Sequence, residues 1–206
     1  MMLAQSLRPP LSGNSVVKQN RRKQLRLKHY NYSDPGMYFV TICVHNRECL
    51  FGDIVDGEMR LNEFGQIVCD EWLKTSDIRP NVELDYFIVM PNHFHGIVRI
   101  MSDRRGVLQY APTSEKRAFH SPSQTIGAIV RGFKSATTKY INQLRGAPGV
   151  PVWQRNYYEH VIRNENELFE TRKYIQDNPL KWDLDPENPD LQTMHGSRSM
   201  NYHAAF

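Results

Sequence analysis

Residues 86–98, Tyr-Phe-Ile-Val-Met-Pro-Asn-His-Phe-His-Gly-Ile-Val, decide the fold more than any other stretch of the sequence. The aromatic and β-branched residues on either side of the proline predict two strands, at 83–90 and 93–100. Pro91-Asn92 separates them, and a proline cannot donate to the ladder of a central strand. We therefore interpret the stretch as two adjacent antiparallel strands joined by a tight turn.

The second of these strands carries two histidines at alternate positions. Side chains two residues apart in a strand face the same side, so His93 and His95 project together while Phe94 points to the opposite, buried face. Two imidazoles side by side make half of a site for a divalent metal. Two histidines without a ligand are an equally simple interpretation of a motif this short.

Further elements flank the hairpin on both sides. They are a strand at 38–44, a short hairpin turning at Asp56-Gly57, a helix after Asn62, a helix from Ser121 to Leu144, a strand at 152–162 and a helix from Asn164 to about Asp177. This order predicts an α+β fold, a ferredoxin-like βαββαβ antiparallel sheet with helices on one face and one further helix at its C-terminal end. Residues 102–120 show no periodicity and predict a long loop.

The charged residues are distributed unevenly along the chain. The 206 residues carry a net charge of +4, but residues 1–33 hold seven Lys or Arg and no Asp or Glu, which leaves a body of net charge −3. We interpret 1–28 as a flexible basic arm, 29–182 as the folded domain and 183–206 as a poorly ordered tail. A basic arm on a mildly acidic body suggests a polyanionic partner, and a solvated tail is the simpler alternative.

Several classes of protein are not supported by the sequence. No apolar run approaches the length of a membrane span, and the first residues lack a secretory signal. The three cysteines form no C-x-x-C pair, so neither a disulfide framework nor a cysteine zinc site is indicated. We expect a cytoplasmic protein with reduced thiols.

Two further groups of residues could bind or react. Tyr174 and Asn178 are spaced to stack on one face of the last helix, although local evidence favours a core-edge tyrosine and a helix terminator. Trp153 and Arg155 interleave an aromatic with a cation, as in single-strand binders, but a strand with core aromatics explains them equally well. The polar face of the 121–144 helix adds Arg131 and Lys134, which suit phosphate contacts or a solvated surface.

Taken together, these segments resemble the single-tyrosine transposases marked by a His-hydrophobe-His strand, above all the REP-associated tyrosine transposases of bacteria. The resemblance runs from about residue 21 to residue 182. It rests on five segments in order: Tyr38-Phe39-Val40-Thr41-Ile42, Leu50-Phe51-Gly52, Met90-Pro91-Asn92-His93-Phe94-His95, Trp153-Gln154-Arg155-Asn156 and Tyr174-Ile175-Gln176-Asp177-Asn178-Pro179. Several motifs in one order are far more specific than any single motif.

The resemblance implies specific roles for these residues. His93 and His95 would ligate Mg²⁺ or Mn²⁺, and Tyr174 would be the nucleophile on the final helix. Asn178 stands where insertion-sequence relatives have a glutamine as third ligand; asparagine reaches less far, so water could take that place. The partner would be single-stranded or hairpin DNA, and the protein would be associated with the nucleoid.

Candidate hairpin contacts are the basic arm with Arg21, Arg22 and Lys23, the 102–120 loop, and Arg131, Lys134, Trp153 and Arg155. Two other functions remain open, a hairpin-binding regulator that no longer cuts and an unrelated metal hydrolase that uses the two histidines. The sequence leaves open whether the site forms within one chain or across a homodimer.

Overall fold

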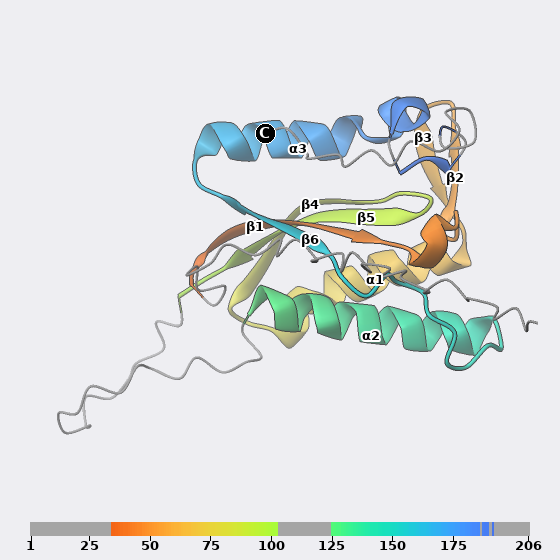
Figure 1. The fold of residues 1–206 in the computed structure, drawn as a ribbon. Helices are drawn as coiled ribbons and strands as arrows, with labels where there is room; N and C mark the ends of the chain where they lie inside the picture. The colour runs from red at the N-terminus through yellow and green to blue at the C-terminus, as the bar shows by residue number, and fades with distance from the viewer. Residues whose placement is uncertain (1–33, 103–124, 186, 190, 192–206) are drawn as a thin grey trace, which may run out of the picture.

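The computed structural model describes residues 34–102, 125–185, 187–189 and 191 (Figure 1). The basic arm at 1–28 and nearly all of the expected 102–120 loop lie outside these residues. No helix among the described residues has the length and apolar character that crossing a membrane requires.

The described chain forms a four-stranded antiparallel sheet with the order β4-β5-β1-β6 and a separate two-stranded hairpin. The main strands are β1 (Gly36–Cys43), β4 (Val82–Val89), β5 (His93–Ile100) and β6 (Tyr158–Ile162), and the hairpin is β2 (Gly52–Val55) with β3 (Glu58–Leu61). Leaving out the small hairpin, this is the strand order of the ferredoxin-like arrangement, so the predicted fold class is confirmed. The turn at Asp56-Gly57 also forms as expected, with both residues at positive φ.

Helices cover both faces of the sheet (Figure 1). They are α1 (Glu63–Ile78), α2 (Ile126–Leu144) and α3 (Glu165–Asp177), with the 3-10 segments η1 (His45–Arg47) and η3 (Pro179–Leu184). The first two pack against one face, and α3 lies over the other. Asn62 caps α1 and Asn164 caps α3 through their side-chain oxygens, and both helices begin after these residues, as the sequence predicts.

The pairing register assigns side chains to the two faces. In β5, His95 pairs with Thr41 and His93 with Cys43, so these four residues share a face. Phe94 points the other way and is fully buried. The two histidines therefore lie on the α3 face, and the predicted alternation in this strand is confirmed.

The larger core lies on the α1 and α2 side. Phe94 packs against Trp72 with ring centroids 4.6 Å apart and against Phe133 at 5.2 Å. Gly96 sits where a side chain has no room, since a Cβ there would lie 2.7 Å from the Trp72 ring. Burying such rings contributes about 1.5–3 kcal/mol each, which fixes the strand that carries the histidines.

Three expected boundaries differ in the structure. The first turn of α2 is capped by Thr125, whose hydroxyl accepts from the Ala128 N–H, and not by Ser121. The strand expected from residue 152 begins at Tyr158, and residues 152–157 form only a single bridge between Trp153 and Val44. The segment after residue 182 continues as η3 to Leu184, and Glu187 contacts Arg47 and Asn92 in the body of the fold.

Candidate functional site

The hydroxyl of Tyr174 faces the imidazole of His95. The distance from Tyr174 Oη to His95 Nε2 is 3.3 Å, and the ring centroids are 5.2 Å apart. Phe39 supports both rings, stacked on His95 at 5.4 Å and edge-on to Tyr174 at 6.0 Å. A residue of α3 and a residue of β5, 79 positions apart, are thus brought together within one chain.

A second histidine lies beside the first. The rings of His93 and His95 are 4.6 Å apart. Each imidazole has a partner at Nδ1: the Thr41 hydroxyl lies 2.8 Å from His95 Nδ1, and Asn92 Oδ1 lies 2.9 Å from His93 Nδ1. With Nδ1 engaged, Nε2 is the remaining nitrogen of each ring; that of His95 faces the Tyr174 hydroxyl, and that of His93 is buried.

Asn178 completes the cluster from the end of α3. It is the C-cap, keeps helical dihedrals at φ −58 and ψ −44, and is buried. Among the described residues, its Oδ1 and the Nε2 of His93 are buried without a hydrogen-bond partner. Two buried polar atoms left unpaired are costly, and a bound cation would satisfy both if Nε2 carries no proton.

Burial controls the ionisation of this cluster. It lowers the pKa of His93 to about 3, the nearby Asn178 side chain acting in the opposite direction, and it lowers the pKa of His95 well below its usual value. Both imidazoles are therefore neutral at pH 7, which is the form that binds metal. Burial also raises the pKa of Tyr174 to about 12, with the charge of Asp185 adding to the effect.

The donor set fits an open metal site. No group of three His, Cys, Asp or Glu side chains within the described part of the chain could hold a metal ion. Two neutral imidazoles and one amide oxygen would instead leave coordination positions for water or a substrate oxygen, as a site that acts on a bound substrate requires. The same observation gives no support to a hydrolase with a complete protein ligand shell.

The segment after α3 lies against the cluster. The Trp182 ring is 6.1 Å from the His93 ring. The Glu187 carboxylate pairs with Arg47 at 3.2 Å, and its backbone carbonyl accepts from Asn92 Nδ2 at 2.6 Å. The residues expected to begin a tail therefore form part of the wall around His93, which is fully buried.

Two of the predicted DNA-contacting residues have structural roles. Trp153 is buried, packs on Phe51 at 5.0 Å and donates from Nε1 to the Thr137 hydroxyl, so it belongs to the core and is not placed to stack on a base. Lys134 Nζ donates to the backbone carbonyls of Gln154 and Arg155. Lys134 therefore fixes the 154–156 loop, and its ammonium group is already occupied.

The structure does not contradict the other predicted DNA contacts. Arg131 on α2 and Arg155 on the adjoining loop are exposed. Lys134 ties that loop to α2, so Arg131 and Arg155 lie on two segments that are joined by hydrogen bonds. Arg21, Arg22 and Lys23 lie outside the described residues.

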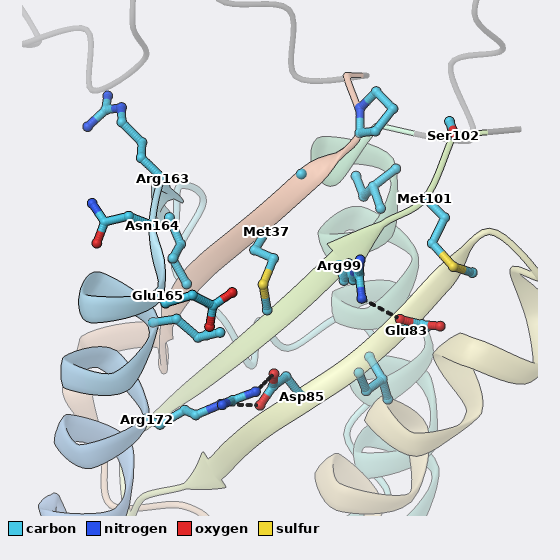
Figure 2. Close-up of a pocket in the computed structure, with 16 residues that line it drawn as sticks. Met37, Glu83, Asp85, Arg99, Met101, Ser102, Arg163, Asn164, Glu165 and Arg172 are labelled. Carbon is cyan, nitrogen blue, oxygen red and sulfur yellow. Dashed lines mark hydrogen bonds and ion pairs between the residues drawn. The ribbon is translucent and has the colours of Figure 1, made fainter.

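A separate groove of about 830 Å³ lies on the α3 face at the other end of the strands (Figure 2). Arg172 and Arg99 line it, and each is paired with a carboxylate, Asp85 and Glu83 respectively. The groove is distinct from the histidine cluster, whose residues do not line it.

Sequence reasoning missed four residues around the histidines: Phe39, Thr41, Asn92 and Trp182. Asn92 precedes His93 directly, so its proximity could have been anticipated. Thr41 and Phe39 lie in the predicted first strand, but the pairing of that strand with β5, and its register, cannot be inferred from one sequence. No signal in the sequence indicated Trp182.

Fold and site together define an α+β protein in which a His-x-His strand faces a tyrosine on a helix of the same chain. No protein-family model matches the chain. An uncharacterized protein of Haemophilus influenzae (strain ATCC 51907 / DSM 11121 / KW20 / Rd) is 43% identical over 170 residues, which cover 81% of this chain and 92% of that protein. The chain belongs to the same family as the Haemophilus protein.

A solved structure shares the fold. The REP-associated tyrosine transposase bound to a REP hairpin matches with a TM-score of 0.50 and 20% sequence identity, over 76% of this chain and 73% of that chain. At this identity the likeness establishes the fold, which is the one that the resemblance of the sequence implies.

Proposed function

We propose that this protein is a divalent-metal-dependent endonuclease and strand transferase that recognises hairpin DNA and cleaves a single strand through Tyr174. The observation that carries the proposal is the 3.3 Å approach of Tyr174 Oη to His95 Nε2, with His93 beside it. The transposase that shares the fold was solved with a REP hairpin, which supports the same class of substrate here.

The residues suit phosphodiester chemistry. His93, His95 and the Asn178 amide oxygen would hold Mg²⁺ or Mn²⁺. When bound, the ion would polarise a non-bridging phosphate oxygen and fix the position of the phosphate. The pKa of Tyr174, raised to about 12 by burial, keeps the hydroxyl protonated at pH 7 in the metal-free protein, so loss of its proton needs a positive charge nearby.

The reaction retains the energy of the cleaved bond. The Tyr174 oxygen forms a bond to phosphorus, the bond from phosphorus to the 3′ oxygen breaks, and the proton lost by the tyrosine is balanced by protonation of that oxygen. The products are a 5′-phosphotyrosine and a free 3′-hydroxyl. Because the ester is retained, a 3′-hydroxyl can attack it and rejoin a strand without a nucleotide cofactor.

Binding of the hairpin would rest on other parts of the molecule. Arg131, Arg155 and the basic arm with Arg21, Arg22 and Lys23 are the proposed phosphate contacts. Contacts of this kind give affinity that falls with salt but no chemistry. Since Tyr174 and His95 meet within one chain, a homodimer is not needed to assemble the site, and dimerisation stays a prediction.

The test is cleavage of a hairpin oligonucleotide with a single-stranded flank, labelled at either end, with Mn²⁺, Mg²⁺ or EDTA. We expect a metal-dependent cut in the flank that leaves the 3′-hydroxyl on one fragment and protein on the 5′ phosphate of the other. Tight hairpin binding without cleavage in any divalent metal would contradict the proposal and favour a regulator that no longer cuts.

A further inference from the structure

Asn92 joins three segments that are far apart in the sequence. It is 1% exposed and sits in the turn between β4 and β5. Its Nδ2 donates to the carbonyl of Arg47 at 3.1 Å and to the carbonyl of Glu187 at 2.6 Å, while its Oδ1 meets His93 Nδ1 at 2.9 Å. Every hydrogen-bonding group of the buried amide is thus aimed at a fixed partner.

These partners determine which way the amide points. Carbonyl oxygens only accept hydrogen bonds, so the two carbonyls of Arg47 and Glu187 must face the NH₂ group of Asn92. The reverse orientation would set Oδ1 against both of them and leave buried acceptors unpaired, at a cost of about 1–3 kcal/mol each. Asn92 therefore presents an oxygen, and only an oxygen, to His93.

The orientation of the amide in turn determines the tautomer of His93. A neutral imidazole carries one proton, and an oxygen acceptor at Nδ1 requires it there. Nε2 is then a bare lone pair, buried on the ring that the Asn178 side chain also approaches, with no hydrogen bond of regular geometry among the described residues. An unprotonated Nε2 can donate its lone pair to a metal ion.

From this network we infer that Asn92 is a positioning residue, which holds His93 in the Nδ1–H tautomer and aims its Nε2 at the metal position. The inference deepens the proposed function, on which its metal-binding part rests. Thr41 is placed to do the same for His95, but a hydroxyl can donate or accept, so only Asn92 imposes the tautomer.

The first experiment measures the tautomer directly in metal-free full-length protein at neutral pH, by long-range ¹H–¹⁵N spectra of ¹⁵N-labelled histidine. We expect His93 to carry its proton on Nδ1 in the wild type and to gain the Nε2–H form in Asn92→Ala. A wild-type His93 protonated on Nε2 would overturn the inference without any variant.

The second experiment measures Mn²⁺ affinity by calorimetry. Loss of an outer partner of a metal ligand typically costs 10–100-fold in affinity, and we expect Asn92→Ala to fall in that range. Asn92→Asp keeps an oxygen acceptor at Nδ1 and should retain the Nδ1–H tautomer, although it loses the donors to the carbonyls of Arg47 and Glu187 and should be less stable. Asn142→Ala is the matched control, since Asn142 is also buried and donates to a backbone carbonyl, that of Val150.

The outcomes distinguish the role of Asn92 from the proposed metal-dependent function. If Asn92→Ala leaves both the tautomer and the Mn²⁺ affinity as in the wild type, or if Asn142→Ala lowers the affinity equally, the inference is wrong. If the wild type has the Nδ1–H tautomer, Asn92→Ala changes it, and neither protein binds Mn²⁺, Asn92 controls the ring as inferred and the metal-dependent function is contradicted.

Discussion

Arg172 and Asp85 form a bidentate ion pair that connects α3 to the edge strand β4. Nε lies 3.0 Å from Oδ1, and Nη2 lies 2.6 Å from Oδ2 (Figure 2). Arg172 comes two residues before Tyr174 on the same helix. The pair therefore helps to set how far the tyrosine hydroxyl stands from His95.

Arg172→Met keeps the aliphatic part of the side chain and removes the guanidinium group. We expect the rate of the covalent step to fall while hairpin affinity stays unchanged, because the variant loosens the helix of Tyr174 but alters no proposed DNA contact. For a partly exposed pair, the loss in unfolding free energy should be about 1 kcal/mol or less. Single-turnover kinetics and binding titrations measure the two effects separately. Arg163→Met, at an exposed arginine of the same groove, is the control, and equal rates in the two variants would refute this role.

The same pair predicts a dependence of stability on pH. Burial raises the pKa of Asp85, but Arg172 and the Tyr86 N–H together outweigh it, and the pKa is lowered overall. A carboxyl with a lowered folded-state pKa stabilises the protein above its unfolded value, about 3.9, and loses that contribution as the pH falls through the folded value. Urea unfolding should show that wild type and Arg172→Met differ at pH 7 and that the difference shrinks as the pH falls below the unfolded value of the carboxyl, about 3.9. A difference that stays constant down to the lowest pH at which both proteins fold would show that the ion pair does not carry it.

Metal binding should depend on both histidines and on Asn178. We expect His93→Ala and His95→Ala to abolish measurable Mn²⁺ binding, and Asn178→Ala to weaken it less, because water can replace an amide oxygen. Calorimetry with Mn²⁺ provides the measurement. His45→Ala is the control, since His45 is exposed on η1 and uses only its backbone N–H for its bond to Val152. Binding that survives in His95→Ala would place the metal elsewhere.

The exposed arginines should contribute to affinity through phosphates. Removing one protein–phosphate interaction makes the slope of log K against log salt shallower by roughly 0.7–0.9. We expect Arg131→Ala and Arg155→Ala each to reduce the slope for hairpin binding by about that amount, with cleavage at saturating DNA unchanged. Lys74→Ala, at an exposed lysine on α1 paired with Glu71, should leave the slope unchanged. If the arginine variants match it, these arginines do not face the DNA.

The parts of the fold that could be predicted from sequence are those specified locally. The caps at Asn62 and Asn164 have their signals within three residues, and the alternation of His93, Phe94 and His95 follows from strand geometry alone. The start of α2 could not be fixed in this way, because Thr125 and Ser121 both offer a capping hydroxyl in sequence.

The candidate residues of the site could be predicted from the sequence, but the residues that support them could not. His93, His95, Tyr174 and Asn178 do come together, although local evidence for the last two favoured a structural role. The hydrogen bonds of Thr41 and Asn92 depend on strand register and on the path of the chain after α3. Trp153 was the opposite case, since an aromatic beside an arginine looks the same in sequence whether it binds a base or fills a core.

The central claim is that Tyr174 is the nucleophile, and mapping the covalent adduct tests it most directly. Protein incubated with a labelled hairpin oligonucleotide and Mn²⁺ is denatured in SDS, digested and examined by mass spectrometry. The account predicts an SDS-stable adduct in the wild type, with the 5′ phosphate on the peptide that contains Tyr174, and none in Tyr174→Phe. An adduct that persists in Tyr174→Phe, or that maps to Tyr157 or Tyr158, would contradict it.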